Sequence, residues 1–539
     1  MAAGTRRTSS LEIRGIMLDL ARLIERHEFY FDLLGRLAEW GFNALWWHFV
    51  DDQGFMLKLD SHPELASPHA FTKAEMRRLI AAAGELGIDV VPEVETLGHG
   101  RYITSLPQYA HLADGDPRQF NAICPSHRDT LKLLGEIIHE TAELFPSPFF
   151  HAGLDEADLS GCKRCARRAK GKPRWWLYGE HTKAMREIIA AAGKRMVMWG
   201  DHIEHDPALL KALPKDILIA HWNYDSVHTE AIERSLKAGF EVVGAPSLMW
   251  YSSTLHPNAR QWTNVEEMTA TARRLKKDGM LGVVNTWWCT WRHLRDNALP
   301  MVAYTGHLLT GGKADRVEFL RRYLAHEHGL RSKTAAEALL TLHEHMITAV
   351  FDKHELLALT WDNLGDLLAC VELAGKEGFA ERAAGLRRAA DVLTATREKV
   401  SKNAEAFAAT ALSAEVAAGL LENALAMREA HRLYLLARRQ HVHGYEPARL
   451  AEGLGQAAEL MQRGTDRLEL YRRAGEREWN RTRYRDDARK HTRDLDRPCS
   501  HDAILGRLAR GERAQKALVK TFARAVRGFL RGGKFPGGF

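Results

Sequence analysis

The chain has 539 residues and a mass of 60.8 kDa, several times the usual domain of about 100–150 residues, so we expect one large domain followed by a second unit. Hydrophobic residues make up 45% of the sequence and charged residues 27%, a composition that excludes a disordered chain, a collagen-like repeat and a disulfide-stapled miniprotein. The net charge of +7 is small for this length and does not by itself indicate a nucleic-acid partner.

Up to about residue 310, short β-branched or aromatic runs alternate with longer stretches of helical spacing, which is typical of a parallel sheet whose strands are joined by helices. Eight strands are predicted, at Ile13–Leu20, Ala44–Phe49, Asp89–Glu95, Pro148–Leu154, Arg195–Gly200, Ile217–Trp222, Glu241–Pro246 and Leu281–Trp287. The predicted helices between them include Phe29–Trp40, Lys73–Leu86, Thr130–Leu144, Gly179–Ala192, His228–Ala238 and Val265–Lys277. Most of these helices are followed by a glycine, which favours the left-handed conformation of a helix cap. Eight strand–helix pairs, with no glycine-rich phosphate turn after the first strand, predict a (β/α)₈ barrel rather than an open doubly wound sheet.

From about Lys313 onward, Ala, Leu, Glu and Arg dominate and apolar residues recur at spacings of three and four. This pattern predicts an all-α C-terminal domain. We therefore expect an N-terminal tail over residues 1–11, the barrel over 12–325 and the helical domain over 326–539. The last stretch, His501–Phe539, holds nine Lys or Arg against two acids. Its apolar and basic residues alternate at helical spacing, which predicts an amphipathic helix packed on the barrel or in its own domain, with attachment to a membrane or another partner as the alternative.

The compartment is predicted from two absences in the sequence. The first fifteen residues contain no apolar stretch typical of a secretory signal. There is also no run of about 18 apolar residues, so we expect no membrane span. The six cysteines are too few and too scattered for a disulfide framework. We expect a cytoplasmic protein with mostly reduced thiols.

Cys162 and Cys165 have the spacing of half a zinc site, but a structural zinc needs two further ligands and no second C-x-x-C is present. Cys124 or His151 would complete such a site only if the fold brought them near. We expect thiols without a metal, and no cofactor.

The histidines could also be interpreted as the metal ligands of a metal-dependent hydrolase. Such a barrel site usually has His-x-His at the end of the first strand, whereas this strand ends with Asp19 and Arg22. We therefore expect no catalytic metal.

The fourth strand ends in two adjacent carboxylates, Asp155 and Glu156. Adjacent side chains of an extended segment point to opposite sides, so both face one pocket only if the chain turns there, which also gives them different environments. Taken alone, the pair also suits the start of a solvated loop. Other strand ends carry a ring of Trp and Tyr with interspersed carboxylates, which suits a sugar because its C–H face stacks on aromatic rings while its hydroxyls bind charged groups.

Four motifs follow successive strands in order: LDLAR at 18–22, WWHFVDD at 46–52, PEVETLGHG at 92–100 and HAGLDE at 151–156. Together they resemble the motifs of glycoside hydrolase family 20, the β-N-acetylhexosaminidases, over about residues 12–310. With its helical C-terminal half, the chain is most similar to the divergent hexosaminidase D-like branch.

The resemblance implies a retaining exo-β-N-acetylhexosaminidase that acts on terminal N-acetyl-β-D-glucosaminides or galactosaminides. In this family the sugar's own acetamido oxygen attacks the anomeric carbon and forms an oxazolinium intermediate. Glu156 would be the general acid and then the base, and Asp155 the anion that holds the acetamido N–H. Arg22 would donate two hydrogen bonds to sugar hydroxyls. The resemblance implies further substrate-binding or supporting roles for Glu95, His99, His151, Trp199, Trp222, Tyr224, Trp250, Tyr251 and Trp287. Among these, His99 and Glu95 would form a pair that tunes the acid, and Tyr224 or Tyr251 would bind the acetamido oxygen.

The chain departs from the family pattern at four places. Leu154 replaces a glycine, Glu95 an aspartate and Leu97 a proline, and no Trp-x-Glu is evident in NTWWCTWRH at 285–293. The preference for gluco or galacto substrates therefore stays open. Two other classes also stay open: a glycan-binding barrel without activity, and a protein attached to nucleic acid or a membrane by its basic tail. We favour a glycan substrate, no nucleic acid and no membrane span, and leave a homodimer open.

Overall fold

The computed structural model describes residues 11–117, 119, 121–250, 255–288, 293–346, 371–484 and 506–537. Eight parallel strands form its centre: β1 (Ile13–Asp19), β2 (Ala44–His48), β5 (Asp89–Glu93), β6 (Phe149–His151), β7 (Arg195–Trp199), β8 (Leu218–Trp222), β9 (Glu241–Ala245) and β11 (Met280–Trp287). They pair in chain order, and β11 pairs back with β1, so the sheet closes into the predicted (β/α)₈ barrel. The short β10 (Ser247–Met249) adds to β11 at its end, and β3 (Val50–Asp51) pairs with β4 (Gly54–Phe55) in a small hairpin.

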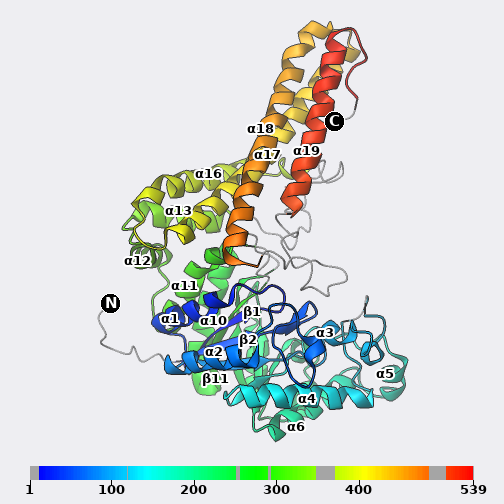
Figure 1. Cartoon of the computed structure of the whole chain (residues 1–539), viewed down its shortest axis with the longest axis vertical. Coiled ribbons are helices and arrows are strands. Elements are labelled where there is room, and N and C mark those ends of the chain that lie inside the picture. Colours follow the sequence, from blue (N-terminus) through cyan, green and yellow to red (C-terminus); the bar gives the residue numbers. More distant parts are fainter. Residues whose placement is uncertain are drawn as a thin grey trace.

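Helices surround this barrel (Figure 1). The long ones are α1 (His27–Glu39), α2 (Lys73–Glu85), α4 (Arg128–Leu144), α6 (Trp176–Ala191), α9 (Thr229–Lys237), α10 (Ala259–Leu275) and α11 (Leu299–Leu309). Short helices in the loops are α3 (Arg101–Thr104), α5 (Lys163–Arg168), α7 (Asp201–His205) and α8 (Leu209–Ala212). The six predicted helices are confirmed. Gly41, Gly87, Gly193, Gly239 and Gly279 all have φ between 72° and 107°, the left-handed region that ends a helix.

The strands follow a two-residue period that decides which side chains enter the barrel. A buried cluster drawn only from strands, including Met17, Trp46, Val197, Trp199 and Val284, fills the interior. Residues at the alternate positions pack outward against the helices. The polar residues that continue the inward series therefore gather at the carboxyl ends of the strands, where barrel enzymes carry their active sites.

The C-terminal region is helical, as predicted, and lies beyond one end of the barrel (Figure 1). It consists of α12 (Arg316–His328), α13 (Lys333–Glu344), α16 (Phe379–Thr396), α17 (Ala404–Val442), α18 (Pro447–Thr482) and α19 (Arg507–Leu530). The boundary expected at residue 325 falls inside α12 and stays a prediction. Phe319 of α12 packs on Tyr304 of α11, with ring centroids 5.0 Å apart, so this helix is continuous with the barrel layer.

The end of α18 joins the helical domain to the loop that follows β1. Arg483 is fully buried and its guanidinium lies 2.8 Å from the Glu25 carboxylate. It also donates a hydrogen bond to the carbonyl of His293, in the loop after β11. Because a buried charge that loses its partner costs about 3–5 kcal/mol, this contact fixes the domain beside the mouth of the barrel.

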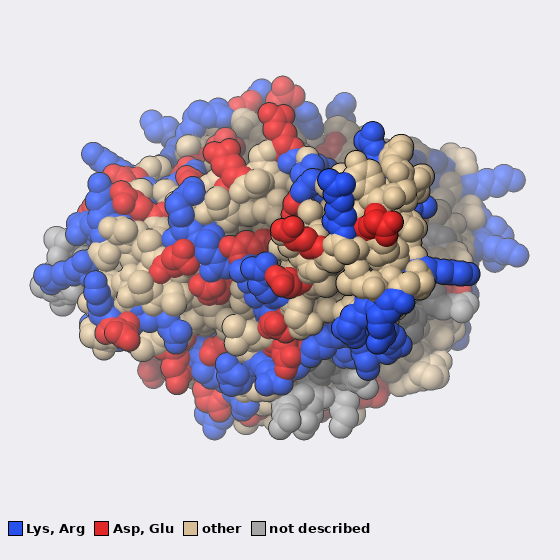
Figure 2. All heavy atoms as spheres, turned by 90° about the horizontal axis from the view of Figure 1, so that it is seen from above, with Lys and Arg blue, Asp and Glu red and all other residues tan. Residues whose placement is uncertain are grey.

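Two helices of this domain concern the predictions about membrane spans and about the basic C-terminal stretch. Among the described residues, α17 is long and apolar enough to cross a membrane, but 67% of its most apolar window is buried inside the protein, as for the core helix of a bundle. The apolar side of α19 is buried, with Phe522 packed near Tyr434, so the predicted packing in its own domain is confirmed. On its polar side Lys516 pairs with Glu469 and Glu512. Basic and acidic groups are interspersed over this end of the molecule (Figure 2).

Candidate active site

The two adjacent carboxylates leave β6 in a turn, as the hypothesis of a shared pocket requires. Gly153, Leu154 and Glu156 have φ of 64°, 77° and 48°. A left-handed leucine costs about 1–2 kcal/mol, and the strain at Leu154 is held because its side chain is fully buried in the core. A Cβ at Gly153 would lie 1.8 Å from Glu95 Oε2, so the turn also needs this glycine.

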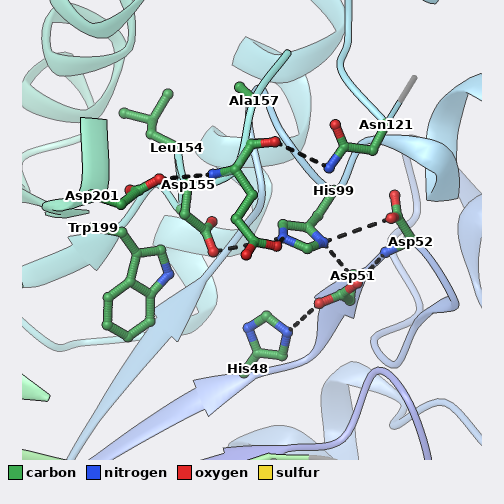
Figure 3. A network of polar contacts seen from close by, with 12 residues as sticks. His48, Asp51, Asp52, His99, Asn121, Leu154, Asp155, Ala157, Trp199 and Asp201 are labelled. Atoms are coloured by element: carbon green, nitrogen blue, oxygen red, sulfur yellow. Dashed lines mark hydrogen bonds and ion pairs between the residues drawn. The ribbon is translucent and has the colours of Figure 1, made fainter. Parts of the chain in front are cut away.

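His99 brings the two carboxylates together. Its Nε2 lies 3.3 Å from Glu156 Oε2 and 3.6 Å from Asp155 Oδ2 (Figure 3). Its Nδ1 lies 3.3 Å from Asp51 Oδ1 on the other side. Burial alone would lower the pKa of His99, but Asp51 and Asp155 hold it well above its usual value. The imidazole is therefore a cation between acids on two strands.

Asp51 is the centre of the charges beneath His99. Besides His99, it contacts Arg22 Nη2 at 2.7 Å and His48 Nε2 at 3.0 Å. Burial alone would raise the pKa of Asp51, but these three groups hold it well below its usual range. Arg22 is also joined to Asp19, three residues earlier, at 3.1 Å. The motifs LDLAR and WWHFVDD thus meet in one buried network.

Below this network lies an inward-facing layer centred on Glu93. Its carboxylate contacts His48 Nδ1 at 2.6 Å and accepts a hydrogen bond from the Trp199 indole at 2.8 Å. Burial would lower the pKa of His48, but Glu93 and Asp51 raise it to about 10. His151 is different: burial holds its pKa well below the usual value, and its Nδ1 accepts a hydrogen bond from Gly153 N at 3.0 Å. His151 thus supports the turn as a neutral ring.

The environments of the pair differ, as expected for two carboxylates with separate tasks. The side chain of Glu156 is 58% exposed, whereas the side chain of Asp155 is 15% exposed. The hydrogen bond from His99 lowers the pKa of Glu156. The backbone of Glu156 is held on both sides, since its N–H donates to Asp201 Oδ2 at 3.0 Å and its carbonyl accepts from Asn121 at 3.4 Å (Figure 3). Burial and the nearby Asp155 raise the pKa of Asp201 to about 8.

Aromatic rings border the pair on the side of β8 to β11. Tyr224 lies between Trp222 and Trp250, at centroid distances of 5.0 and 5.2 Å. Its hydroxyl accepts a hydrogen bond from the Trp288 indole at 2.7 Å. The indole N–H groups of Trp222 and Trp250 are buried without an acceptor in the described part of the chain.

The prediction for Trp287 is wrong. Its ring packs outward against Phe29, and its N–H donates to His293. The next residue, Trp288, enters the barrel instead, 4.8 Å from the His48 ring and with its face toward Arg22. The two-residue period of β11, with Val284 inside, is the reason. Tyr251 lies outside the described residues.

The ion partner of His99 Nδ1 is Asp51, whereas Glu95, the other residue expected to tune the acid, lies under the turn after β6. Glu95 points beneath Gly153 and is 1% exposed. Burial, followed by the charges of Asp155 and Glu93, raises its pKa well above the usual value. Glu95 is therefore held in its neutral form under the turn.

Several members of the site were missed from the sequence: Asp19, His48, Asp51, Glu93, Asn121, Asp201 and Trp288. Asp51 ends β3, just after β2, and Asp201 follows β7 after one glycine, so the strand-end rule was a usable signal for these two residues. Asn121 sits in the middle of a long loop and carries no comparable signal.

Two groups of acids and histidines in this site place ligand atoms within 4.8 Å of one another. The histidine of each group is paired with acids of the site: His48 contacts Asp51 and Glu93, and His99 contacts Asp51.

Comparison with known proteins gives a consistent result. Residues 12–300 match the model of the glycosyl hydrolase family 20 catalytic domain. The β-hexosaminidase of Vibrio furnissii is 28% identical over 275 residues, covering 44% of this chain and 43% of that protein. Human β-hexosaminidase subunit beta is 26% identical over 298 residues, covering 51% and 52%. The chain thus spans about half the length of the curated relatives it matches. The crystal structure of a β-N-acetylhexosaminidase from Bacteroides fragilis shares the fold, with a TM-score of 0.50, 20% identity and coverage of 59% and 70%.

Proposed function

The chain belongs to glycosyl hydrolase family 20, and from this we propose that it hydrolyses terminal N-acetyl-β-D-glucosaminides or galactosaminides with retention of configuration. The observation that carries the proposal is the turn after β6, which directs both Asp155 and Glu156 toward His99 at the mouth of the barrel. Family membership rests on the match over residues 12–300.

In the proposed reaction the acetamido oxygen of the sugar forms a bond to the anomeric carbon while the bond to the leaving oxygen breaks. Asp155, the less exposed carboxylate, accepts a hydrogen bond from the acetamido N–H and stabilises the positive charge of the oxazolinium ion. Glu156 protonates the leaving oxygen and then takes a proton from the water that opens the intermediate. The Tyr224 hydroxyl orients the acetamido oxygen, and Trp222, Trp250 and Trp288 border the sugar.

Glu156 needs a proton for the first step, yet His99 favours its ionised form in the free protein. A bound sugar would cover the exposed Glu156 carboxylate and remove water from it, and desolvation raises the pKa of a carboxyl group. The substrate would therefore itself promote the protonated form.

The direct test compares substrates that differ only in the amide. We expect release of nitrophenol from the N-acetyl-β-glucosaminide or the N-acetyl-β-galactosaminide, and turnover of the plain β-glucoside that is lower by orders of magnitude, because the plain sugar has no internal nucleophile. A thiazoline analogue of the intermediate should inhibit competitively. Equal cleavage of the plain glucoside would refute the mechanism, and sugar binding without hydrolysis across a glycan panel would favour the inactive glycan-binding barrel.

The pH dependence tests the role of His99. A general acid loses its proton as the pH rises through its pKa, so kcat/KM falls on the alkaline side of the pH profile. The midpoint of this alkaline limb gives the pKa of the acid in the free enzyme. Replacing His99 by Asn removes the group that lowers the pKa of Glu156 and leaves burial, which raises it. We expect the alkaline limb of kcat/KM to move to higher pH in this variant. His139→Asn, on the exposed side of α4, is the control and should not move it; a limb that stays in place or moves to lower pH in the His99 variant would contradict the assignment.

We also propose a cytoplasmic location, because the six cysteines of the sequence are too few and too scattered for a disulfide framework.

A further inference from the structure

Three cysteines from two separate loops meet beside the candidate active site. Cys124 lies in the loop between β5 and α4, whereas Cys162 and Cys165 are at the start of α5, in the loop after β6. Cys124 Sγ is 3.5 Å from Cys162 Sγ and 3.5 Å from Cys165 Sγ, and all three sulfurs lie within 4.8 Å of one another. A disulfide requires about 2.05 Å. Sulfurs bound to one zinc at about 2.3 Å in a tetrahedron lie about 3.8 Å apart, close to what is found.

A buried carboxylate lies beside the three cysteines. Asp114 is fully buried, and neither of its oxygens has a hydrogen-bond partner among the described residues. The Asp114 amide donates to the Ala122 carbonyl, in a pairing that places it next to Cys124. The Cys165 thiol and the Cys162 N–H face its carboxylate. A carboxylate without a partner is costly to bury unless a cation compensates it.

We propose that Cys124, Cys162, Cys165 and Asp114 bind one structural zinc ion. Thiolates select zinc over magnesium and calcium, and an iron–sulfur cluster would want a fourth cysteine. Four protein ligands leave no open position for a substrate, which is the pattern of a structural site. The surroundings also suit a metal: Leu177 and Trp176 shield the sulfurs, and Arg164 Nη1 lies 3.6 Å from Cys124 Sγ, where it offsets the excess negative charge.

The fold meets the condition that the sequence left open, since it brings Cys124 to Cys162 and Cys165. The missing third sulfur comes from Cys124, 38 residues before Cys162. His151, the other residue considered, lies in the barrel between Trp46 and Trp199, with centroids at 5.0 and 4.5 Å. The spacing of a single C-x-x-C could not reveal this.

The metal would join the two loops that hold the catalytic pair. Asn121, three residues before Cys124, donates to the Glu156 carbonyl and accepts a hydrogen bond from Gly100 N at 2.7 Å. Cys162 follows Glu156 by six residues in the other loop. Zinc would therefore fix the backbone of Glu156 relative to His99. This consequence for activity rests on the proposed function, but zinc binding itself does not.

The test is metal analysis of the full-length chain, purified without chelator. We expect about one zinc per chain, and after exchange with cobalt the thiolate charge-transfer and intense visible bands of a tetrahedral site. Cys124→Ser and Cys162→Ser should lose most of the metal, and Asp114→Asn should release zinc to a competing chelator faster than the wild type. Cys370→Ser, at a cysteine outside the described residues, is the matched control and should keep the full content.

Several outcomes would overturn the proposal. They are a wild-type chain that holds no stoichiometric zinc even after reconstitution, a disulfide among the three cysteines in the mass of the unreduced protein, and equal metal loss in Cys370→Ser. The cobalt spectrum of the wild type keeps the test decisive if a cysteine variant fails to fold. Zinc binding without hydrolysis would refute only the proposed function, and hydrolysis without zinc would refute only this site.

Discussion

Replacing Glu156 by Gln should lower kcat/KM by about 10²–10⁴-fold on a disaccharide, the usual range for loss of a general acid. The amide keeps the shape of the side chain but cannot deliver a proton to the leaving sugar. A nitrophenyl glycoside should be affected much less in its first step, because nitrophenolate leaves without protonation. The measurement is therefore kcat/KM for both substrates with each protein.

The matched control is Glu187→Gln on the exposed side of α6, which should be indistinguishable from the wild type on both substrates. Near wild-type turnover of a natural glycan by the Glu156 variant would remove this residue from the mechanism. An equal loss on both substrates would also argue against the acid role, since it would indicate damage to binding or to the turn.

Replacing Asp155 by Asn should lower kcat by about 10²–10³-fold, the usual cost of removing one group that stabilises developing charge. In contrast to the Glu156 variant, the loss should be the same for the nitrophenyl glycoside and the disaccharide, because the oxazolinium ion must form in both cases. The fold should persist, since Asp155 is partly exposed and contacts His99 only at 3.6 Å. Measuring kcat for both substrates separates the two carboxylates.

Asp278→Asn is the control for this variant, because Asp278 is exposed just before β11, at the opposite end of the barrel. If the Asp155 variant kept full activity on N-acetyl substrates, the proposed stabilisation of the acetamido group would fail. Loss of activity confined to the disaccharide would assign Asp155 to proton delivery instead.

Much of the barrel could be predicted because its signals are local. β-branched runs, helical spacing and glycines such as Gly41 and Gly239 act within a few residues, so the eight strands and their order needed no distant contact. The two adjacent carboxylates could be recognised for the same reason. The adjacent Asp155 and Glu156 follow a strand, and facing one pocket required a turn, which the positive φ of Leu154 and Glu156 provides.

Other features depend on where the barrel brings distant segments. The sequence pattern could not tell that Trp288 rather than Trp287 faces inward, because one residue of register moves a side chain to the opposite face of a strand. Nor could it pair His99 with Asp51, or bring Cys124 to Cys162 and Cys165.

Local conformational preferences thus account for the elements and for the chemistry that each strand end carries. The choice of partners among buried charges, sulfurs and aromatic rings follows from closure of the barrel and packing of its loops. Electrostatic and coordination energies depend on distances across the fold, and these distances are set only when segments far apart in the chain meet.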